Sequence, residues 1–356
     1  MSVEKLRIEQ FRCLQSVDIE ADARQNVILG PNGAGKTSVL EALFFLGRGR
    51  SFRPGHSANL IQTGAGNFTL YAELRSAAGR HRLGVQLSRA DGLEVHIDGE
   101  GGGARADLVS AFPVQVIDPE VHEMVQGGPK GRRRFLDWGV FHVKHDFFPV
   151  WRRYRKALQQ RNRALRQGMA RDTVAAWNTE LIASGIEIDG LRRTYLEGLI
   201  PHLEDLSTTL LGLPASCRYK RGWSAEIDYA EALEASWQRD ADHGQTHVGP
   251  HRAELALEVD EVAARNRLSR GQQKLLGISL LLAQTQFVAE RLDRDVTLLV
   301  DEPAAELDNE RLERLMSVLA SSRAQLFISA LDREALPLDA PARVFHVERG
   351  QLTTLL

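Results

Sequence analysis

The segment from Gly30 to Thr37 reads GPNGAGKT and constrains this chain more than any other feature. It fits the pattern G-x-x-x-x-G-K-[ST], in which glycines let backbone N–H groups face phosphate oxygens. A short apolar run at 26–29 precedes it, and residues 37–46 predict a helix that ends at Gly47. Phosphates would then lie at a helix N-terminus, where the helix dipole favours negative charge. This context predicts a nucleoside triphosphate site rather than a chance glycine-rich turn.

The motif also assigns roles to single side chains. Lys36 would place its ammonium on the β- and γ-phosphates and act in catalysis, and Thr37 would offer its hydroxyl to Mg²⁺. We therefore expect ATP and Mg²⁺ as cofactors. The residues expected to contact the nucleotide from this loop are Gly30, Pro31, Asn32, Gly33, Ala34, Gly35, Lys36, Thr37 and Ser38.

A second motif supplies the carboxylates that such a site needs. Residues 297–303 read TLLVDEP, an apolar strand that ends in two acids. Asp301 fits the carboxylate on the Mg²⁺ side, and Glu302 fits a general base for the attacking water. A strand capped by two solvated acids is common on its own. The phosphate loop in the same chain favours the catalytic interpretation.

A third motif, LSRGQQ at 268–273, precedes a predicted helix at 270–292 and matches the L-S-x-G-Q signature of ABC-type ATPases. There Ser269, Gly271 and Gln272 would face the nucleotide of a second protomer. An ordinary N-cap by Ser269 is compatible with that role. Residues 305–308 follow in the position of the D-loop, with Asp308 as the expected interface residue.

Two further elements of such ATPases are weak in this sequence. The strand at 325–330 reads QLFISA and carries no switch histidine, so Ser329 is the candidate in its place. The missing sensor predicts slow hydrolysis. Gln115 is the candidate for the Q-loop.

The order of predicted elements indicates an α/β protein interrupted by helices. We expect an ATPase lobe with the phosphate loop at 1–118 and a basic helical lobe at 119–250. The signature, the acidic strand and the return to the ATPase lobe would occupy 251–356. This is the pattern of an ABC/SMC-like ATPase head with a P-loop core and a helical second lobe. One helical face of the middle lobe, predicted to pack in the core, holds Trp151, Tyr154, Leu158, Leu165 and Met169.

Composition places the chain in a cellular compartment. Cys13 and Cys217 lie far apart in no metal-ligand spacing, so we expect reduced thiols. The N-terminus has no apolar core of a secretion signal, and no apolar run is long enough to cross a membrane. We expect a cytoplasmic protein with no membrane partner.

Charge is distributed unevenly although the net charge is only −2. Residues 130–171 hold thirteen Lys and Arg residues against Asp137 and Asp146, enough to attract a nucleic-acid backbone. No base-reading motif is present, so contact would be to backbone or shape. The alternative is a solvated helix face with acidic partners elsewhere, and Arg132–Arg134 could instead lie near the nucleotide. The candidates for DNA contact are Arg152, Arg153, Arg155, Lys156, Arg161 and Arg163.

Several blocks resemble the RecF family, in the SMC-like branch of ABC ATPases. They are LRIEQFR at 6–12, LEAL at 40–43, GRSFR at 49–53, GGP with RRRFLD at 127–137, and GPHR at 249–252. The last block continues with Ala253 and Glu254, a partial departure from the acidic residues frequent there. The resemblance implies an ATP-driven homodimer that binds DNA at gaps or single-strand/double-strand junctions in recombinational repair, with weak hydrolysis releasing it. It also implies RecR and RecO as partners.

One other interpretation stays open at this point, and a further one fails on length. The chain could be the ATPase subunit of a transporter or another ABC machine that never touches DNA, which would predict a switch histidine and a surface for a membrane partner. It could also be an SMC-like ATPase with long coiled coils. The helical middle of about 120 residues is too short for a long arm, and heptads are not sustained.

Overall fold

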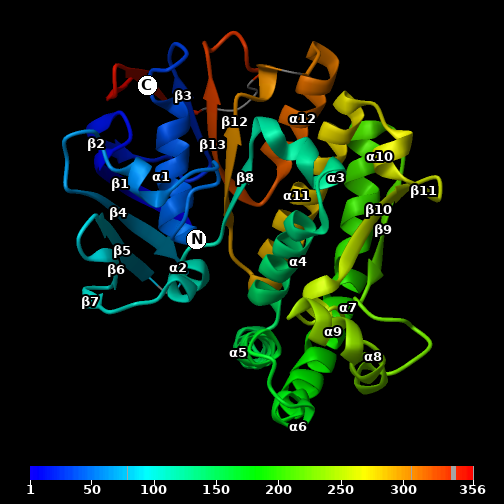
Figure 1. The fold of residues 1–356 in the computed structure, drawn as a ribbon. Coiled ribbons are helices and arrows are strands. Elements are labelled where there is room, and N and C mark those ends of the chain that lie inside the picture. Colours follow the sequence, from blue (N-terminus) through cyan, green and yellow to red (C-terminus); the bar gives the residue numbers. More distant parts are fainter. Residues whose placement is uncertain (78, 306, 338–341, 356) are drawn as a thin grey trace. The chain divides into compact units, whose positions relative to one another are not determined.

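The computed structural model divides the chain into two compact units (Figure 1). Unit 1 comprises residues 1–121 and 281–356, and unit 2 comprises residues 122–280. Residues 251–280, which include the signature segment, thus cluster with unit 2. The structure describes residues 1–77, 79–305, 307–337 and 342–355.

A mainly parallel sheet forms one layer of unit 1. Its strand order is β15-β14-β3-β13-β12-β8, with only β15 antiparallel to its neighbour. β3, β12 and β13 are buried along their whole length, as expected of parallel strands covered on both faces. The strands predicted at 297–303 and 325–330 are confirmed as β12 and β13. The bounds are β3 Gln25–Leu29, β8 Val114–Ile117, β12 Val296–Asp301, β13 Ala324–Ala330, β14 Arg343–Glu348 and β15 Gln351–Thr354.

An antiparallel sheet of order β2-β1-β4-β5-β6-β7 forms the other layer. Alternate residues of β4 are buried, because one face of this sheet covers the core. The glycine-rich segment at 99–103 includes the short strand β7. The bounds are β1 Ser2–Phe11, β2 Leu14–Glu20, β4 Asn67–Ser76, β5 Gly79–Ser88, β6 Gly92–Ile97 and β7 Glu100–Gly101.

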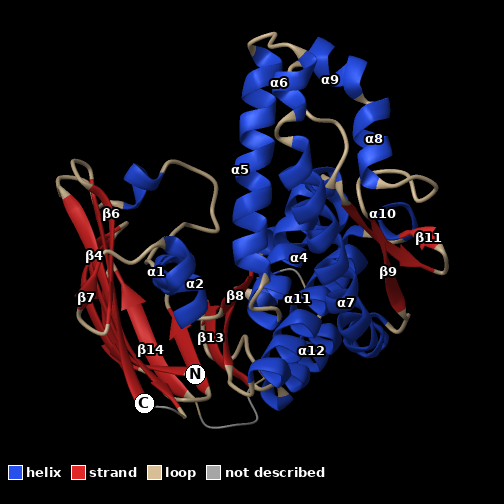
Figure 2. Cartoon of the chain, turned by 90° about the horizontal axis from the view of Figure 1, so that it is seen from below, coloured by secondary structure: helices blue, strands red, loops and turns tan. Residues whose placement is uncertain are grey.

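Helix α1, Lys36–Arg48, shares one hydrophobic core with both sheets (Figure 2). Phe45 of α1 meets Phe68 of β4 edge-on, with ring centroids 5.2 Å apart. The helix does not end at Gly47 as expected. It ends at Gly49, which takes the left-handed conformation with φ of 60°. Gly47 lies inside the helix, where a Cβ atom would come within 2.4 Å of Val114.

The remaining helices of unit 1 are short or connect the strands. The Asp308 side chain caps α12. The bounds are η1 Ser57–Leu60, α2 Arg105–Ala111, η4 Pro303–Ala305 and α12 Asn309–Ser321, and η2 Pro119–His122 leads out of the unit.

Unit 2 is largely helical, as predicted for the middle of the chain. α5 packs against the 34-residue helix α7, and Tyr154, Ile188 and Tyr195 are buried there. α11 begins in unit 2 and continues into unit 1. The bounds are α3 Glu123–Gln126, α4 Pro129–Val143, α5 Phe147–Arg166, α6 Arg171–Ala175, α7 Asn178–Leu211, α8 Tyr229–Ala235, α9 Trp237–His243, η3 Pro250–Arg252, α10 Ala264–Arg267 and α11 Arg270–Leu292.

The expected core face of α5 is only partly correct. Tyr154 and Leu165 are buried, and Trp151 and Leu158 are half-buried. Met169 is 44% exposed, because α5 ends at Arg166 before the chain turns. The last member of the predicted stripe therefore contributes little to the core.

A small sheet in unit 2 was missed by the sequence analysis. It has the order β11-β10-β9, with β9 Ala215–Lys220, β10 Glu254–Val259 and β11 Val262–Ala263. β9 carries few apolar residues and is stabilised by pairing with β10, which lies about 40 residues away in the chain. A strand that depends on such a distant partner leaves little local signal.

Candidate functional site

The phosphate-loop segment connects β3 to α1 within unit 1. Gly30 has φ of 150°, and a Cβ atom there would lie 2.2 Å from the carbonyl oxygen of Val347. Gly35, at the start of α1, has φ of 120°. These backbone conformations disfavour other residues, so the loop needs its glycines for shape.

Lys36 is held inside this loop rather than directed into solvent. Its side chain is 3% exposed, and Nζ donates to the carbonyl oxygens of Gly30 at 2.7 Å and Pro31 at 3.2 Å. Nζ also lies 3.0 Å from Oε1 of Glu302. The two residues that the sequence assigned to catalysis are therefore direct neighbours.

The strand register brings the second acid and its hydrogen-bond donors together. β12 and β13 are parallel neighbours, and Asp301 lies opposite Ser329. The Ser329 hydroxyl donates to Oδ1 of Asp301 at 2.7 Å, and the Thr37 hydroxyl donates to the same carboxylate at 3.0 Å. Burial raises the pKa of Asp301, while the hydrogen bonds from Ser329 and Thr37 oppose that shift. Thr37 and Asp301 thus present adjacent oxygen atoms, the donor type that Mg²⁺ prefers.

Ser329, the candidate in place of a switch histidine, has its hydroxyl engaged where β12 and β13 end. It is fully buried, and its hydroxyl also accepts a hydrogen bond from the backbone N–H of Glu302 at 3.0 Å. Glu302 has φ of 48°, a left-handed conformation that costs a non-glycine residue roughly 1–3 kcal/mol. Ser329 therefore supports a strained backbone turn between the two acids.

A hollow of about 180 Å³ brings the motif residues together with two residues that the sequence analysis gave no role. Arg53 and Cys13 are these additions. The only sequence signal for Arg53 was its place in the GRSFR block. The lining residues are Cys13, Gly33, Gly35, Lys36, Thr37, Ser38, Arg53 and Glu302. An adjoining hollow of about 270 Å³ includes Asn32, Glu302 and Ser329 in its lining.

Gln115 is a poor Q-loop candidate. Its side chain is buried, accepts a hydrogen bond from Arg48 at 3.0 Å and donates one to Gln284 at 2.5 Å. A buried side chain with these partners inside the unit is not directed toward a nucleotide. That expectation is wrong because Gln115 lies within β8, before the strand ends.

The signature residues lie at the N-terminus of α11 in unit 2. The hydroxyl of Ser269 accepts from the N–H of Gln272 at 3.4 Å, and the side chain of Gln272 accepts from the N–H of Ser269 at 3.0 Å. This reciprocal pair is a capping box. Gly271 lies between them in the first turn of the helix.

The D-loop segment is described only in part. The Asp308 carboxylate caps α12 by accepting from the N–H of Arg311 at 2.9 Å, and its side chain is 55% exposed. Glu306, which was named in the same segment, lies outside the described residues.

The basic residues of α5 fall into two groups. Arg161 is 1% exposed, lies 2.7 Å from Asp240 and donates to Thr246 and Asn178. Its assignment to DNA contact is therefore wrong. Arg153 is exposed but pairs with Glu187 at 2.9 Å and with Glu180 at 3.4 Å.

The other group forms what we call the open cationic face, made of Arg152, Arg155, Lys156 and Arg163. All four are exposed, and none forms an ion pair with an acid among the described residues. Their spacing places them on one side of the helix. Arg132 and Arg133 are different again, because Arg132 pairs with Glu254 at 2.8 Å and Arg133 donates to the carbonyl of Ala253.

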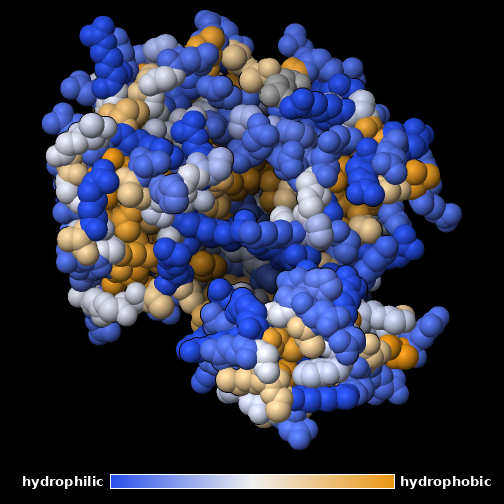
Figure 3. Space-filling model, viewed as in Figure 1, coloured by the Kyte–Doolittle hydropathy of each residue, from blue (hydrophilic) through white to orange (hydrophobic). Residues whose placement is uncertain are grey.

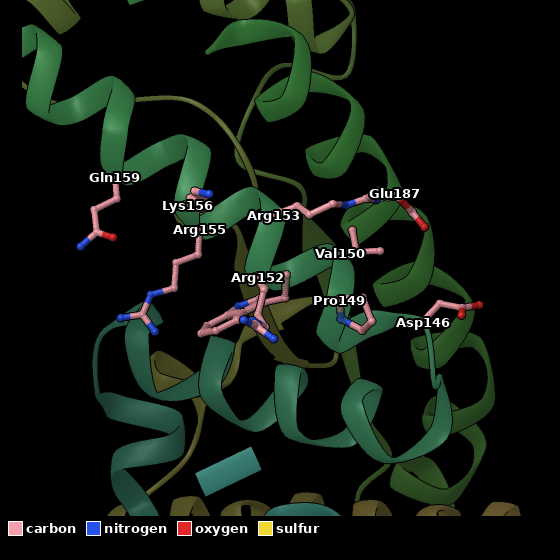
Figure 4. A pocket seen from close by; sticks show the side chains of 10 residues that line it. Asp146, Pro149, Val150, Arg152, Arg153, Arg155, Lys156, Gln159 and Glu187 are labelled. Carbon is pink, nitrogen blue, oxygen red and sulfur yellow. Dashed lines mark hydrogen bonds and ion pairs between the residues drawn. The ribbon is translucent and has the colours of Figure 1, made fainter. Parts of the chain in front are cut away.

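A hollow of about 730 Å³ lies on α5 beside the open cationic face (Figure 4). In that view Arg153 reaches toward Glu187, whereas Arg155 and Gln159 point away from it. Figure 3 shows hydrophilic side chains with apolar ones between them at the bottom of the view, where Figure 1 places α5 and α6. The full lining is Asp146, Pro149, Val150, Trp151, Arg152, Arg153, Arg155, Lys156, Gln159 and Glu187.

Comparison with known proteins agrees with the geometry. The family model described as RecF/RecN/SMC N terminal domain matches residues 2–353. A DNA replication and repair protein RecF from Shewanella baltica (strain OS155) is 38% identical over 360 residues, covering 100% of both chains. The chain belongs to the RecF family. Its RecF relative from Shewanella oneidensis is 37% identical over 360 residues, again with 100% of both chains covered.

Solved structures confirm the fold of this RecF-family protein. A structure described as recombination mediator protein RecF-ATP in the RecFOR pathway has a TM-score of 0.90 at 23% identity, covering 100% of this chain and 98% of that one. An SMC head bound to the C-winged helix domain of ScpA has a TM-score of 0.63 at 14% identity, covering 100% and 98%. The predicted ABC/SMC-like ATPase head with a helical second lobe is therefore correct.

Full-length membership of the RecF family does not favour the transporter alternative. Within the described residues, every helix is too short or too polar to cross a bilayer.

Proposed function

We propose that this RecF-family chain is an ATP-dependent DNA-binding protein of recombinational repair and replication-gap processing. Two protomers would sandwich two ATP molecules, bind DNA as a dimer and release it after slow hydrolysis. The observation that carries the proposal is the hollow where Lys36, Thr37 and Glu302 meet, with Asp301 hydrogen-bonded to Thr37. This set provides phosphate binding, metal coordination and a general base in one place.

Each group in the hollow has a distinct task in this proposal. Lys36 would exchange its contacts with Gly30, Pro31 and Glu302 for phosphate oxygens. That exchange would free the Glu302 carboxylate to take a proton from the attacking water. Thr37 and Asp301 would hold Mg²⁺, which would neutralise phosphate charge.

The signature segment supplies the reason for a dimer. Ser269 is exposed at the N-terminus of the 23-residue helix α11, and the capping box fixes the orientation of its hydroxyl. A helix N-terminus favours an anion. In ABC-type ATPases this surface faces the nucleotide of the second protomer, so Ser269, Gly271 and Gln272 would complete the partner's site, with Asp308 at the same interface.

Slow turnover follows from the surroundings of Ser329. Its hydroxyl donates to Asp301 and accepts from the N–H of Glu302 inside the sheet. No histidine follows β13 at the position where a switch histidine would sense the γ-phosphate. We therefore propose that ATP acts mainly as a switch for assembly, with hydrolysis as the slow release step.

DNA contact is assigned to the open cationic face of α5. Charges without acidic partners can release counterions from a phosphate backbone, whereas paired charges contribute less. The family relationship further suggests gapped DNA as the ligand and RecR and RecO as partners. A protein of this kind would work in the cytoplasm.

The decisive experiment measures binding to labelled gapped duplex DNA by anisotropy, with ATP, with ADP and without nucleotide. Tight, salt-sensitive binding only with ATP supports the proposal. Lys36→Met should lose ATP binding, dimerisation and DNA binding together. Removing one partner from a buried charge-assisted contact costs about 2–5 kcal/mol, which corresponds to roughly 30- to 5000-fold.

Ser269→Arg separates the two halves of the mechanism. The monomer should still bind ATP, because Ser269 contributes nothing to the hollow around Lys36. Dimerisation measured by mass photometry should be lost. A variant that dimerises normally with ATP would overturn the sandwich arrangement.

A further inference from the structure

The hollow on α5 combines two kinds of surface that a phosphate alone would not require. Arg152, Arg155 and Lys156 provide positive charge, whereas Pro149 and Trp151 provide apolar area beside them. A phosphate backbone needs only the cations. The apolar area matches a ligand that carries a flat apolar group next to its negative charge.

Trp151 and Arg155 form the planar part of the hollow. The guanidinium carbon of Arg155 lies 4.9 Å from the centroid of the Trp151 ring. Unpaired bases stack on aromatic rings and on arginine planes, and such stacking tolerates any base. Because Arg155 has no acidic partner among the described residues, its charge stays available to a neighbouring phosphate.

A second arginine–tryptophan pair in unit 2 shows that the arrangement alone is not sufficient. Arg171 lies over Trp237 at 5.3 Å, but Arg171 also forms an ion pair with Glu234. Trp237 packs against a small apolar cluster that includes Leu165. Intramolecular contacts therefore occupy both residues of that pair. The Trp151 and Arg155 pair instead borders a hollow of about 730 Å³.

Acids at the rim limit where an anion can lie. Glu187 is engaged by Arg153 at 2.9 Å, and Asp146 lies immediately before the start of α5. Both would repel phosphate at that end. The favourable position for an anion is therefore beside Arg152, Arg155 and Lys156.

We infer that this hollow binds unpaired nucleotides of single-stranded DNA, with a base against the Trp151 and Arg155 pair and phosphates at the open cationic face. The inference rests on the proposed DNA-binding function and specifies its ligand at one site. Duplex DNA keeps its bases stacked inside the helix, so it would use the cations but not Trp151. A single strand at the edge of a gap can use both.

The test separates the base from the phosphates. The wild type and Trp151→Ala are titrated, with ATP present, into a labelled oligothymidylate and into a labelled abasic strand of the same length. The wild type should prefer the oligothymidylate by about 5- to 150-fold, the range expected for one stacked base. Trp151→Ala should lose most of this preference while its affinity for the abasic strand stays the same.

Two sets of variants guard against a folding defect. Trp151→Phe keeps an aromatic ring and should retain most of the preference. Arg155→Gln should weaken binding to both strands, whereas its matched control Arg171→Gln should weaken neither. Thermal unfolding of each variant establishes that the fold is kept.

The outcomes that overturn the inference are distinct from failure of the proposed function. Equal affinity of the wild type for both strands, or a preference that persists in Trp151→Ala, excludes a base at Trp151. The inference would also be overturned, in favour of a protein partner, if an acidic peptide displaced the oligothymidylate from the wild type and this displacement were lost in Trp151→Ala. ATP-dependent binding to gapped duplex can survive each of these results, and only its loss removes the proposed function.

Discussion

The phosphate-loop site of unit 1 and helix α5 of unit 2 treat charge in opposite ways. In unit 1, Lys36 lies 3.0 Å from Glu302, and Asp301 accepts hydrogen bonds from Thr37 and Ser329. On α5, Arg161 is paired and buried and Arg153 is paired and exposed, whereas other arginines are exposed without an acidic partner among the described residues. The number of charged residues in a segment therefore says little about its function, because the role of each charged side chain depends on whether it has a partner of opposite charge.

The partners also lie at different distances along the chain. Lys36 and Thr37 belong to one short motif whose spacing fixes their relative positions. Arg161 pairs with Asp240, which lies 79 residues further along the sequence, and Arg153 pairs with Glu187, 34 residues further along. Variants in both regions can therefore test what decides the role of a charged side chain: its position in the sequence or the partner that folding brings to it.

The largest effect is expected from Glu302→Gln. The amide keeps the size of the side chain but cannot accept a proton from water, so turnover should fall by about 10²–10⁴-fold. Phosphate release measures the rate, and mass photometry should show that the ATP dimer accumulates. Glu310→Gln, which removes an exposed acid of α12, is the control. Rapid turnover in Glu302→Gln would exclude this residue as the base.

The next largest effect is on stability and comes from Arg161→Ala. The substitution leaves Asp240, which is fully buried, without its cation. Breaking a buried pair in this way costs about 3–5 kcal/mol in the free energy of unfolding. Arg163→Ala, two residues further on the exposed side, should change it by less than about 0.5 kcal/mol.

Denaturant unfolding of the two variants compares a paired and an open arginine of one helix. Similar losses of stability in both would show that the division of α5 into two groups has no energetic basis. A small loss in Arg161→Ala alone would show that water or the remaining partners of Asp240, such as His247 at 3.0 Å, replace the guanidinium.

The same contrast explains how much could be predicted from the sequence. The phosphate loop, the acidic strand and the signature were found because each consists of neighbouring residues with a required spacing. The DNA-contact assignment of Arg161 failed because a helix face read alone gives no sign of Asp240. β9 was missed for the same reason, since its pairing with β10 is long-range. Arg53 belonged to the GRSFR block but had no assigned role, and only folding places it in the same hollow as Lys36.

A third prediction concerns the open cationic face as a unit. Replacing Arg152, Arg155 and Lys156 together by glutamine should reduce the slope of log affinity against log salt by about 3, one for each phosphate that these cations would neutralise. The fold should be unaffected, because all three side chains are exposed. Anisotropy titrations with gapped DNA over a range of salt concentrations give the slope.

The matched control for these cations is Arg153→Gln. Arg153 lies on the same helix but is already paired with Glu187 and Glu180, so the slope should change by less than about 1. If Arg153→Gln lowers the slope as much as an open cation does, DNA competes successfully for Arg153. The distinction between paired and open charges would then not govern DNA binding.

The smallest effect is expected from Ser329→Ala, which removes one hydroxyl next to the Asp301 carboxylate. Burial already raises the pKa of Asp301, and the hydrogen bond from Ser329 opposes this shift by favouring the ionised form. Without it the pKa rises further, because the ionised carboxylate loses one of its hydrogen-bond donors. Because Mg²⁺ needs the ionised carboxylate, Mg²⁺-dependent ATP binding should weaken at a higher pH than in the wild type as the solution is acidified.

The control for Ser329→Ala is Ser322→Ala. Ser322 is also buried and donates its hydroxyl to a carbonyl oxygen, that of Leu319, whereas Ser329 donates to a carboxylate. Ser322→Ala loses one buried hydrogen bond and should be destabilised by about 1 kcal/mol, whereas Ser329→Ala loses two and should be destabilised by about 2 kcal/mol. Only Ser329→Ala should raise the pH at which Mg²⁺-dependent ATP binding begins to weaken on acidification, which is the acid limb of the pH profile. An unchanged acid limb would mean that Thr37 alone keeps Asp301 ionised, and that Ser329 serves mainly to hold the backbone N–H of Glu302 in its left-handed turn.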